Sequence, residues 1–370
     1  MKRYYYLVIN ENINSGLLKS QVTDVIKNQN ISLINVHKFH IKNRTYQNSI
    51  NIPLAIPYKL FMFNIFFFMT PIFAFIYALI LLPIVKKNSI VISRSYFPSL
   101  VMLILSKLKN VDYIFDTRSL FIDESTLNGT IKENGLNYKM WKYLEKKILC
   151  SSSKTTAVSL KQKEYYELIC PTVLVELIPC YVSPVEIISE GKKLELRKKI
   201  GFNNDDIVIA YFGSMDNGWN NIDMYASFFK ECKNFGYKIL LISQNYNSLK
   251  LDNRLSSEHI TILNTNNKNS KELQEYLQIA DYGVVLMKKA ADWETRLSVK
   301  FVEYLNVGLK VIVGEYVGEA ARYAKDVFKN DTVIYYDKNS IESLTKNFEK
   351  YDNSKTEEIF GLHNFQKLVD

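Results

Sequence analysis

The sequence predicts an α/β protein with two Rossmann-like domains that face each other across a cleft. Strand-like apolar segments alternate with helix-like segments from residue 4 to residue 184, which implies a parallel sheet covered on both faces. After the charged run 189–206, the same alternation begins again at residue 207 and continues to residue 337. Two successive open α/β units make the cleft between them the natural ligand site.

Strands are expected where β-branched and aromatic runs are bounded by turn residues. In the first half these runs are 4–9, 31–36, 89–93, 111–116 and 154–159, with helices at about 17–28, 98–108 and 141–149. In the second half they are 207–215, 237–243, 259–264, 281–287, 309–314 and 332–337. We expect a first domain at 1–185, a second domain at 186–345, and a C-terminal helix within 346–370 that packs toward the first domain.

The segment 60–85 contains no charged residue and is flanked by Lys59, Lys86 and Lys87. Its length would span a bilayer, but Pro71 and Pro83 interrupt it, so a transmembrane helix is the least favoured of three interpretations. A buried helix pair is the second. Insertion into one leaflet, with the lysines at headgroup level, is favoured because the segment has little polar face.

The net charge of +9 comes without an arginine-rich arm or a nucleic-acid motif, so no nucleic-acid partner is expected. Such a basic balance suits anionic lipids or phosphorylated substrates. The four cysteines form no C-x-x-C pair, and their spacing suggests buried thiols of a cytoplasmic protein rather than a disulfide framework.

The stretch 297–313 predicts a helix with Lys300 and Glu303 on one face, followed by a short buried strand. Ser298 is its expected N-cap, and Gly308 is expected to end it. An isolated pair of this kind is usually a solvated ion pair. Here Arg296 and Lys300, at the start of the helix, could instead neutralise a phosphate group.

Other candidates lie where strands are expected to end. Gly213 and Ser214 follow the first strand of the second unit, where a backbone can approach a phosphate, and Gly16 holds the same position in the first. The charged loop after residue 115 contains Asp116, Arg118 and Glu124. These charges favour binding, although an ion pair of Arg118 with either carboxylate could be only structural.

Several chemistries lack their motifs. The sequence contains no G-x-G-x-x-G, Walker loop, G-x-S-x-G or H-E-x-x-H, and its four histidines are scattered. No D-x-D occurs, so no metal that bridges a diphosphate to two aspartates is expected.

The motifs resemble the GT-B glycosyltransferases of sequence family 4, of the bacterial surface-polysaccharide type. The resemblance runs along nearly the whole chain and is most specific at "SVKFVEYLNVGLKVIV". It implies that Glu303 binds the donor ribose hydroxyls and that Lys300 contacts the donor diphosphate. Members often carry a second glutamate eight residues before Glu303, where this chain has Thr295, with Glu294 beside it as the candidate catalytic group.

The resemblance implies a retaining, metal-independent transfer from a nucleotide-diphosphate sugar, with no other cofactor. Asp116 or Arg118 would do the catalytic work of an acceptor-side histidine that has no match here, and Glu124 would lie on the acceptor side. We expect a polyprenyl-diphosphate-linked glycan as acceptor, in O-antigen or capsule synthesis at the cytoplasmic face of the inner membrane. A sugar-nucleotide epimerase of the same fold and a non-catalytic membrane scaffold are the alternatives.

Overall fold

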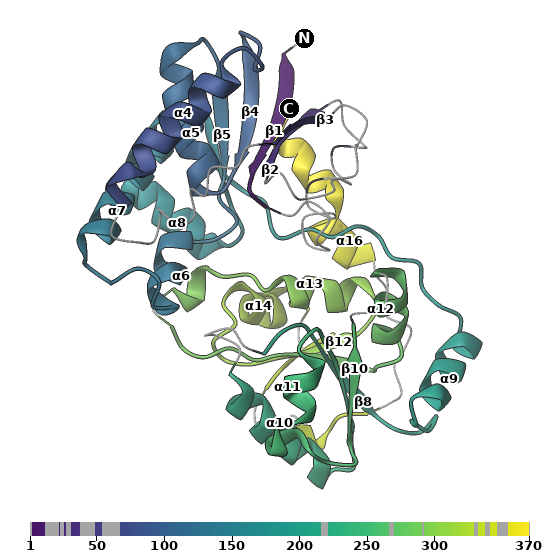
Figure 1. Ribbon diagram of the computed structural model, residues 1–370. Helices are drawn as coiled ribbons and strands as arrows, with labels where there is room; N and C mark the ends of the chain where they lie inside the picture. Colours follow the sequence, from purple (N-terminus) through teal and green to yellow (C-terminus); the bar gives the residue numbers. More distant parts are fainter. Residues whose placement is uncertain are drawn as a thin grey trace. The chain divides into compact units, whose positions relative to one another are not determined.

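The computed structural model describes residues 2–11, 22, 26, 31–37, 49–53, 67–215, 221–265, 270–290, 292–328, 332–336, 341–345 and 354–369. The chain forms two compact units, each described by itself below. The first comprises Met1–Ser183 with Leu362–Asp370, and the second Pro184–Gly361. Both are α/β units with parallel sheets, which confirms the predicted fold class (Figure 1).

The sheet of the first unit has the strand order β3-β2-β1-β4-β5-β6-β7 in the described residues. Its strands are β1 (Arg3–Ile9), β2 (Ile31–His37), β3 (Ser49–Pro53), β4 (Ser89–Arg94), β5 (Asp112–Asp116), β6 (Lys154–Ala157) and β7 (Val175–Leu177). Sequence analysis did not predict the edge strand β3. It is short and polar at Asn51, and it ends on Pro53, a residue that within sheets is found mainly in edge strands.

The helices of the first unit cover both faces of this sheet. They are α4 (Thr70–Leu81), which follows the short η2 (Phe67–Met69), then α5 (Tyr96–Leu108), α6 (Phe121–Leu127), α7 (Leu136–Ser151), α8 (Leu160–Ile169) and the 3-10 segment η6 (Leu362–Leu368). Tyr5 and Leu7 of β1 face the core beneath α4, α5 and α7, whereas Tyr6 and Val8 face η6. The Tyr6 ring lies 6.0 Å from that of Phe365, so the C-terminal segment packs on the first sheet.

The second unit repeats this plan with the strand order β10-β9-β8-β11-β12-β13. Its strands are β8 (Val208–Phe212), β9 (Lys238–Ser243), β10 (Ile260–Asn264), β11 (Tyr282–Val285), β12 (Lys310–Val313) and β13 (Val333–Tyr335). Its helical segments are α9 (Glu190–Lys199), α10 (Ile222–Asn234), α11 (Tyr246–Lys250), η3 (Asn253–Leu255), α12 (Ser270–Leu277), η4 (Trp293–Thr295), α13 (Val299–Asn306), α14 (Glu319–Arg322), η5 (Tyr323–Val327) and α16 (Ser354–Phe360). The predicted helix and strand after Leu297 are therefore present as α13 and β12.

The apolar segment 60–85 is described from residue 67 onward, and it forms α4 rather than a continuous span. Pro71 lies in the first turn of α4, where its missing N–H costs no helical hydrogen bond. One face of α4 is buried and the other is exposed, so the buried interpretation holds for only half of the helix. No helix in the described residues is long and apolar enough to cross a membrane.

The cysteine expectation was wrong for one pair. Cys150, at the end of α7, and Cys170, which caps α8, form a disulfide with their Cα atoms 5.8 Å apart. The two helices bring together residues that are 20 positions apart in sequence, a proximity that spacing alone does not reveal. Cys180 and Cys232 are free and buried.

Candidate functional site

The strand order of the second unit reverses between β8 and β11, which makes this the switch point of the sheet. These two strands pair only at Ile209 and Ala210 of β8, with Tyr282 and Gly283 of β11. Beyond Ala210 the carboxyl end of β8 is no longer paired with β11. Ligands of open α/β sheets bind outside the carboxyl ends of strands at such a point.

Tyr304 of α13 fills the space that the separating strands leave. Its hydroxyl accepts a hydrogen bond of 2.9 Å from the backbone N–H of Phe212, the last residue of β8. Its ring lies directly over Gly283, where an added Cβ would be only 2.3 Å from the ring carbons. Tyr304 therefore fixes α13 against both strands of the switch point.

This packing brings Lys300, one turn earlier on α13, to Gly213. A Cβ at Gly213 would lie 2.6 Å from Lys300 Cε, and the φ of +132° at Gly213 disfavours any residue with a side chain. Lys300 Nζ is 5.3 Å from the centre of the Tyr211 ring. Within the described contacts the ammonium has neither an ion pair nor a hydrogen bond. Burial lowers the Lys300 pKa, and Glu303 partly opposes that shift.

Glu303 follows on the same face of α13 and is partly buried. Its carboxylate has no hydrogen-bond or ion-pair partner among the described residues, and neither oxygen is sealed from solvent. Burial raises the pKa of Glu303 to about 7, although Lys300 acts in the opposite direction. The switch point thus presents a cation and a carboxyl group that both retain their hydrogen-bonding capacity for a ligand.

Ser214 continues the loop after Gly213 and is held on two sides. The Tyr211 hydroxyl donates to the Ser214 carbonyl oxygen at 2.6 Å, and Asn245 Nδ2 lies 3.4 Å from Ser214 Oγ. The loop conformation is therefore set by β8 itself and by the residues after β9. Sequence reasoning found Gly213 and Ser214 but missed the role of Tyr211 and Tyr304, whose only signal was their position beside site residues.

Arg296, predicted as a second phosphate ligand, is engaged within the unit. Its Nη2 and Nε atoms donate to the Asp292 carboxylate at 2.6 and 3.1 Å, and both side chains are buried. Glu294, the predicted catalytic glutamate, lies between them in η4 and is exposed. Lys300 and Glu303 are therefore the better placed of the predicted donor residues.

In the first unit Asp116 is completely buried at the end of β5. The Tyr6 hydroxyl donates to its carboxylate, as does Thr156 Oγ1 at 3.0 Å, and Arg118 Nε lies 2.8 Å from it. Arg118 has a left-handed backbone with a φ of 63°, and its Nη2 donates to the Tyr181 hydroxyl at 2.9 Å. These contacts hold the loop in place and leave Asp116 no exposed surface for an acceptor.

The remaining candidates of the first unit are less informative. Glu124, in the first turn of α6, accepts a hydrogen bond of 3.0 Å from Ser119 Oγ in the preceding loop. Arg94, which sequence reasoning did not single out, is buried at the end of β4 and pairs with Glu11 at 3.3 Å. Gly16 lies outside the described residues.

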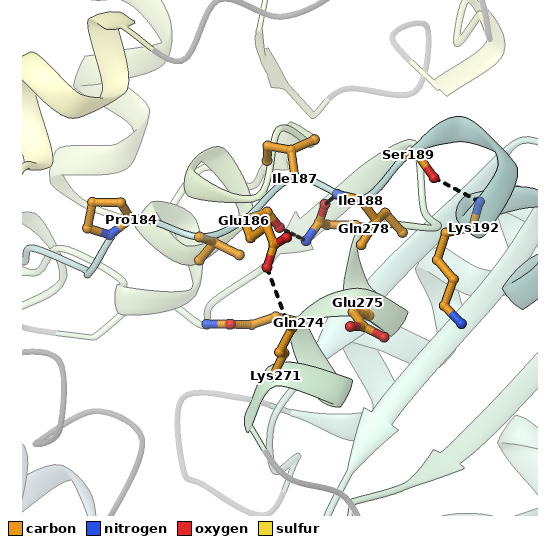
Figure 2. A pocket seen from close by; sticks show the side chains of 11 residues that line it. Pro184, Glu186, Ile187, Ile188, Ser189, Lys192, Lys271, Gln274, Glu275 and Gln278 are labelled. Carbon is orange, nitrogen blue, oxygen red and sulfur yellow. Dashed lines mark hydrogen bonds and ion pairs between the residues drawn. The ribbon is translucent and has the colours of Figure 1, made fainter.

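A cavity of about 560 Å³ lies elsewhere in the second unit, between the segment 184–189 and α12 (Figure 2). Gln278 holds this segment, because its Oε1 accepts from the Ile188 N–H at 2.9 Å and its Nε2 donates to the Glu186 carbonyl at 3.0 Å. Lys271 pairs with Glu186 at 3.0 Å on the exposed rim. The cavity contains none of the switch-point residues.

No group of three or more metal-ligating side chains occurs in the part of the chain that the structure describes. The described switch point therefore offers cationic and hydrogen-bonding groups, which suit an anionic ligand that carries hydroxyl groups.

No protein-family model and no curated protein matches the chain. Solved structures match it along its whole length. Sucrose-phosphate synthase from Thermosynechococcus elongatus aligns with a TM-score of 0.69 and 13% identity, covering 100% of this chain and 98% of the other. A UDP-forming α,α-trehalose-phosphate synthase from Burkholderia xenovorans, in complex with glucose-6-phosphate, gives 0.68 and 10%, covering 98% and 97%.

The chain has the GT-B fold. A third similar structure, a trehalose-6-phosphate protein from E. coli bound with UDP-2-fluoro glucose, has a TM-score of 0.61 and 12% identity, covering 100% of this chain and 95% of the other. At such identities the likeness establishes the fold, and the activity is argued from the site.

Gly283→Ala should destabilise the protein by about 1–3 kcal/mol, the usual cost of an overpacked core, because the methyl group would enter the Tyr304 ring. Urea unfolding measures the change. Gly191→Ala is the control: Gly191 lies in α9 with open space around it, so alanine there should leave stability unchanged or raise it slightly. Equal effects of the two substitutions would contradict the proposed contact.

The raised pKa of Glu303 predicts a pH-dependent stability. Between its ordinary pKa of 4.5 and about 7, the folded state keeps a proton that the unfolded state has lost. The Glu303 contribution therefore falls as the pH rises through this window, by at most about 1.4 kcal/mol per pH unit. Relative to wild type, Glu303→Gln should gain stability from pH 5 to pH 7 in urea unfolding.

The exposed Glu294 provides the matched control for this measurement. Glu294→Gln should keep a constant stability difference from wild type over the same pH range. A constant difference for Glu303→Gln as well would show that the Glu303 carboxyl is not perturbed in the folded protein.

Proposed function

We propose that the protein is a retaining glycosyltransferase that binds a nucleotide-diphosphate sugar at the carboxyl end of β8. The observation that carries this proposal is the arrangement of Lys300 against Gly213, with Glu303 on the same face of α13. The ammonium would contact the diphosphate, and the carboxylate would accept hydrogen bonds from two neighbouring ribose hydroxyls.

The transfer would depend on stabilising the negative charge of the leaving diphosphate. The bond between the sugar's anomeric carbon and the diphosphate oxygen breaks, and the acceptor oxygen forms a bond on the same face of the sugar. The acceptor proton passes to the leaving phosphate, so no separate base is required. Lys300 would stabilise the negative charge that develops on the leaving diphosphate, a large contribution to such reactions. The reaction would need neither a metal ion nor another cofactor.

The similar structures support a nucleotide-sugar donor. One is a UDP-forming synthase, and another is bound with UDP-2-fluoro glucose. The pairing of Arg296 with Asp292 leaves Lys300 as the principal diphosphate contact in our proposal. Glu294 is exposed in η4, beside the Arg296–Asp292 pair, and its role toward the donor sugar stays a prediction.

For the acceptor we propose a glycan on a polyprenyl diphosphate, in assembly of a bacterial O-antigen or capsule at the cytoplasmic face of the inner membrane, as in family 4. The Burkholderia structure binds glucose-6-phosphate, so a sugar phosphate is the competing acceptor. In the first unit, however, the described arginines at the strand ends are matched by carboxylates. Arg94 pairs with Glu11 and Arg118 with Asp116, which leaves little net charge there for a phosphate.

The donor site is tested by thermal unfolding with UDP, GDP, CMP and their sugars, with and without EDTA. A ligand at a hundredfold its Kd adds about 2.7 kcal/mol to stability. One nucleotide diphosphate should stabilise the wild type regardless of EDTA. Lys300→Ala should weaken its binding roughly 10- to 100-fold, the value of a charge-assisted hydrogen bond.

Lys325 is the matched control for Lys300, because its ammonium also lies over a tyrosine ring, 4.7 Å from the centre of Tyr335. Lys325→Ala should bind the nucleotide as the wild type does. If no nucleotide stabilises the protein, the donor site is wrong and a scaffold role is favoured. If the donor binds but its sugar is converted without an acceptor, an epimerase is favoured.

The acceptor is tested by measuring sugar transfer from the nucleotide sugar that stabilises the protein in thermal unfolding. Transfer to membrane-extracted lipid-linked glycan, with none to glucose-6-phosphate, supports the proposal. Transfer to glucose-6-phosphate alone would replace the lipid acceptor by a sugar phosphate while leaving the donor site intact.

A further inference from the structure

The outer face of α4 is an exposed apolar surface without a single charge. Its members are Phe68, just before the helix, and Ile72, Phe75, Ile76 and Leu79, with exposures of 58, 54, 45, 36 and 45%. They recur at intervals of three or four residues and therefore form one stripe along the helix. An ordinary surface helix carries polar residues at such positions.

The other face of α4 packs into the core of the first unit. Ala74, Tyr77, Ala78 and Leu81 are fully buried in the core that α4 shares with α5. The two polar side chains of the helix, Thr70 and Tyr77, are on this inner side, 1 and 0% exposed. A rotation of α4 that buried the outer face would therefore expose Ala74, Ala78 and Leu81 instead.

In the sequence on either side of α4 the charged residues are all basic. From residue 25 to residue 111 the sequence contains ten lysine or arginine residues and no aspartate or glutamate. This stretch alone carries +10, whereas the whole chain carries +9, so the rest of the protein is close to neutral. At the C-terminal end of α4, Lys86 and Lys87 are exposed, and Lys107 is exposed with Leu108 at the end of α5.

Lys109 ties the turn after α4, which carries Lys86 and Lys87, to the end of α5. Lys109 Nζ donates to the carbonyl oxygens of Leu82, at 2.6 Å, and of Val85, which are the residues that follow α4. The turn that presents Lys86 and Lys87 is thereby held to the end of α5. The basic group and the apolar stripe keep a fixed position relative to each other.

We propose that the outer face of α4 docks into one leaflet of an anionic lipid membrane, with Lys86, Lys87 and Lys107 at the level of the lipid phosphates. Its 12 residues extend only about 18 Å, too short for a hydrocarbon core of about 30 Å. The helix would lie along the interface, where apolar burial and attraction to anionic headgroups act together. A second copy of the chain fits less well, because a symmetric contact would oppose like charges.

This inference deepens the proposed function in one respect, since it names the surface that would bring the first unit to a lipid-linked acceptor. Binding to lipid itself requires no catalysis. It is measured by co-sedimentation of the full chain with vesicles of phosphatidylcholine alone, or of phosphatidylcholine with phosphatidylglycerol. The wild type should bind the phosphatidylglycerol vesicles, more weakly at high salt, and should bind phosphatidylcholine alone poorly.

Phe75→Glu combined with Leu79→Glu should weaken vesicle binding by roughly tenfold or more, because two apolar side chains no longer leave water. The matched control is Leu168→Glu with Leu174→Glu, which changes two exposed leucines on and after α8, and should bind as the wild type does. The double variant Lys86→Glu with Lys87→Glu should abolish the preference for phosphatidylglycerol. Its control changes two exposed lysines on α7 in the same way, Lys146→Glu with Lys147→Glu. This control variant should keep the preference.

The proposal is overturned if the α4 variant binds vesicles as well as the wild type, or if the leucine control loses binding equally. It is also overturned if the wild type does not bind vesicles and is a dimer that the α4 variant converts to a monomer.

Nucleotide stabilisation of the same α4 variant separates the lipid proposal from the donor-site proposal. Lost vesicle binding with normal nucleotide binding is the expected result, and absent nucleotide binding in every variant would refute only the donor site.

Discussion

The contact of Tyr304 with Gly283 and with the Phe212 backbone is the constraint on which the candidate site depends. Where β8 and β11 stop pairing, the Phe212 N–H would be left without a strand partner, and the Tyr304 hydroxyl accepts it. A buried N–H without a partner is costly, so the tyrosine satisfies the strand end while its ring fills the gap over Gly283. Lys300 and Glu303 acquire their positions from this packing, since they lie on the same short helix.

Lys300 differs from the buried arginines described here in having no ion-paired carboxylate among the described residues. Arg118 lies against Asp116, Arg296 pairs with Asp292, and Arg197 donates to Asp281 at 2.7 Å within the second unit. Each of these cations has a carboxylate that offsets the cost of removing it from water. Lys300 has no such partner within the described residues, and its lowered pKa reflects that cost. A cation without an ion-paired carboxylate, beside an open strand end, suits the diphosphate that we propose as ligand.

The sequence sufficed for the alternation of strands and helices, because apolar runs and their turn residues are local features. It also identified Gly213, Lys300 and Glu303, which are close in sequence to a strand end or to one another. It could not show that Arg296 is engaged by Asp292, nor that Asp116 is buried beneath Tyr6, because both depend on side-chain placement. Tyr6 and Asp116 are 110 residues apart, and only the sheet brings them together.

α4 shows that an apolar helix can be buried on one face and exposed on the other. Burial of one face does not exclude the contact with lipid that we propose for the other face, because the helix carries no charged residue. α4 uses the small residues Ala74 and Ala78 to approach α5 closely, and large residues such as Ile72 and Phe75 face outward. Large apolar side chains on the outer face are the reverse of what a solvent-facing helix needs. The excess charge of the chain belongs to the same unit as α4, so we attribute it to the proposed lipid partner of α4 rather than to the nucleotide, which we place in the second unit.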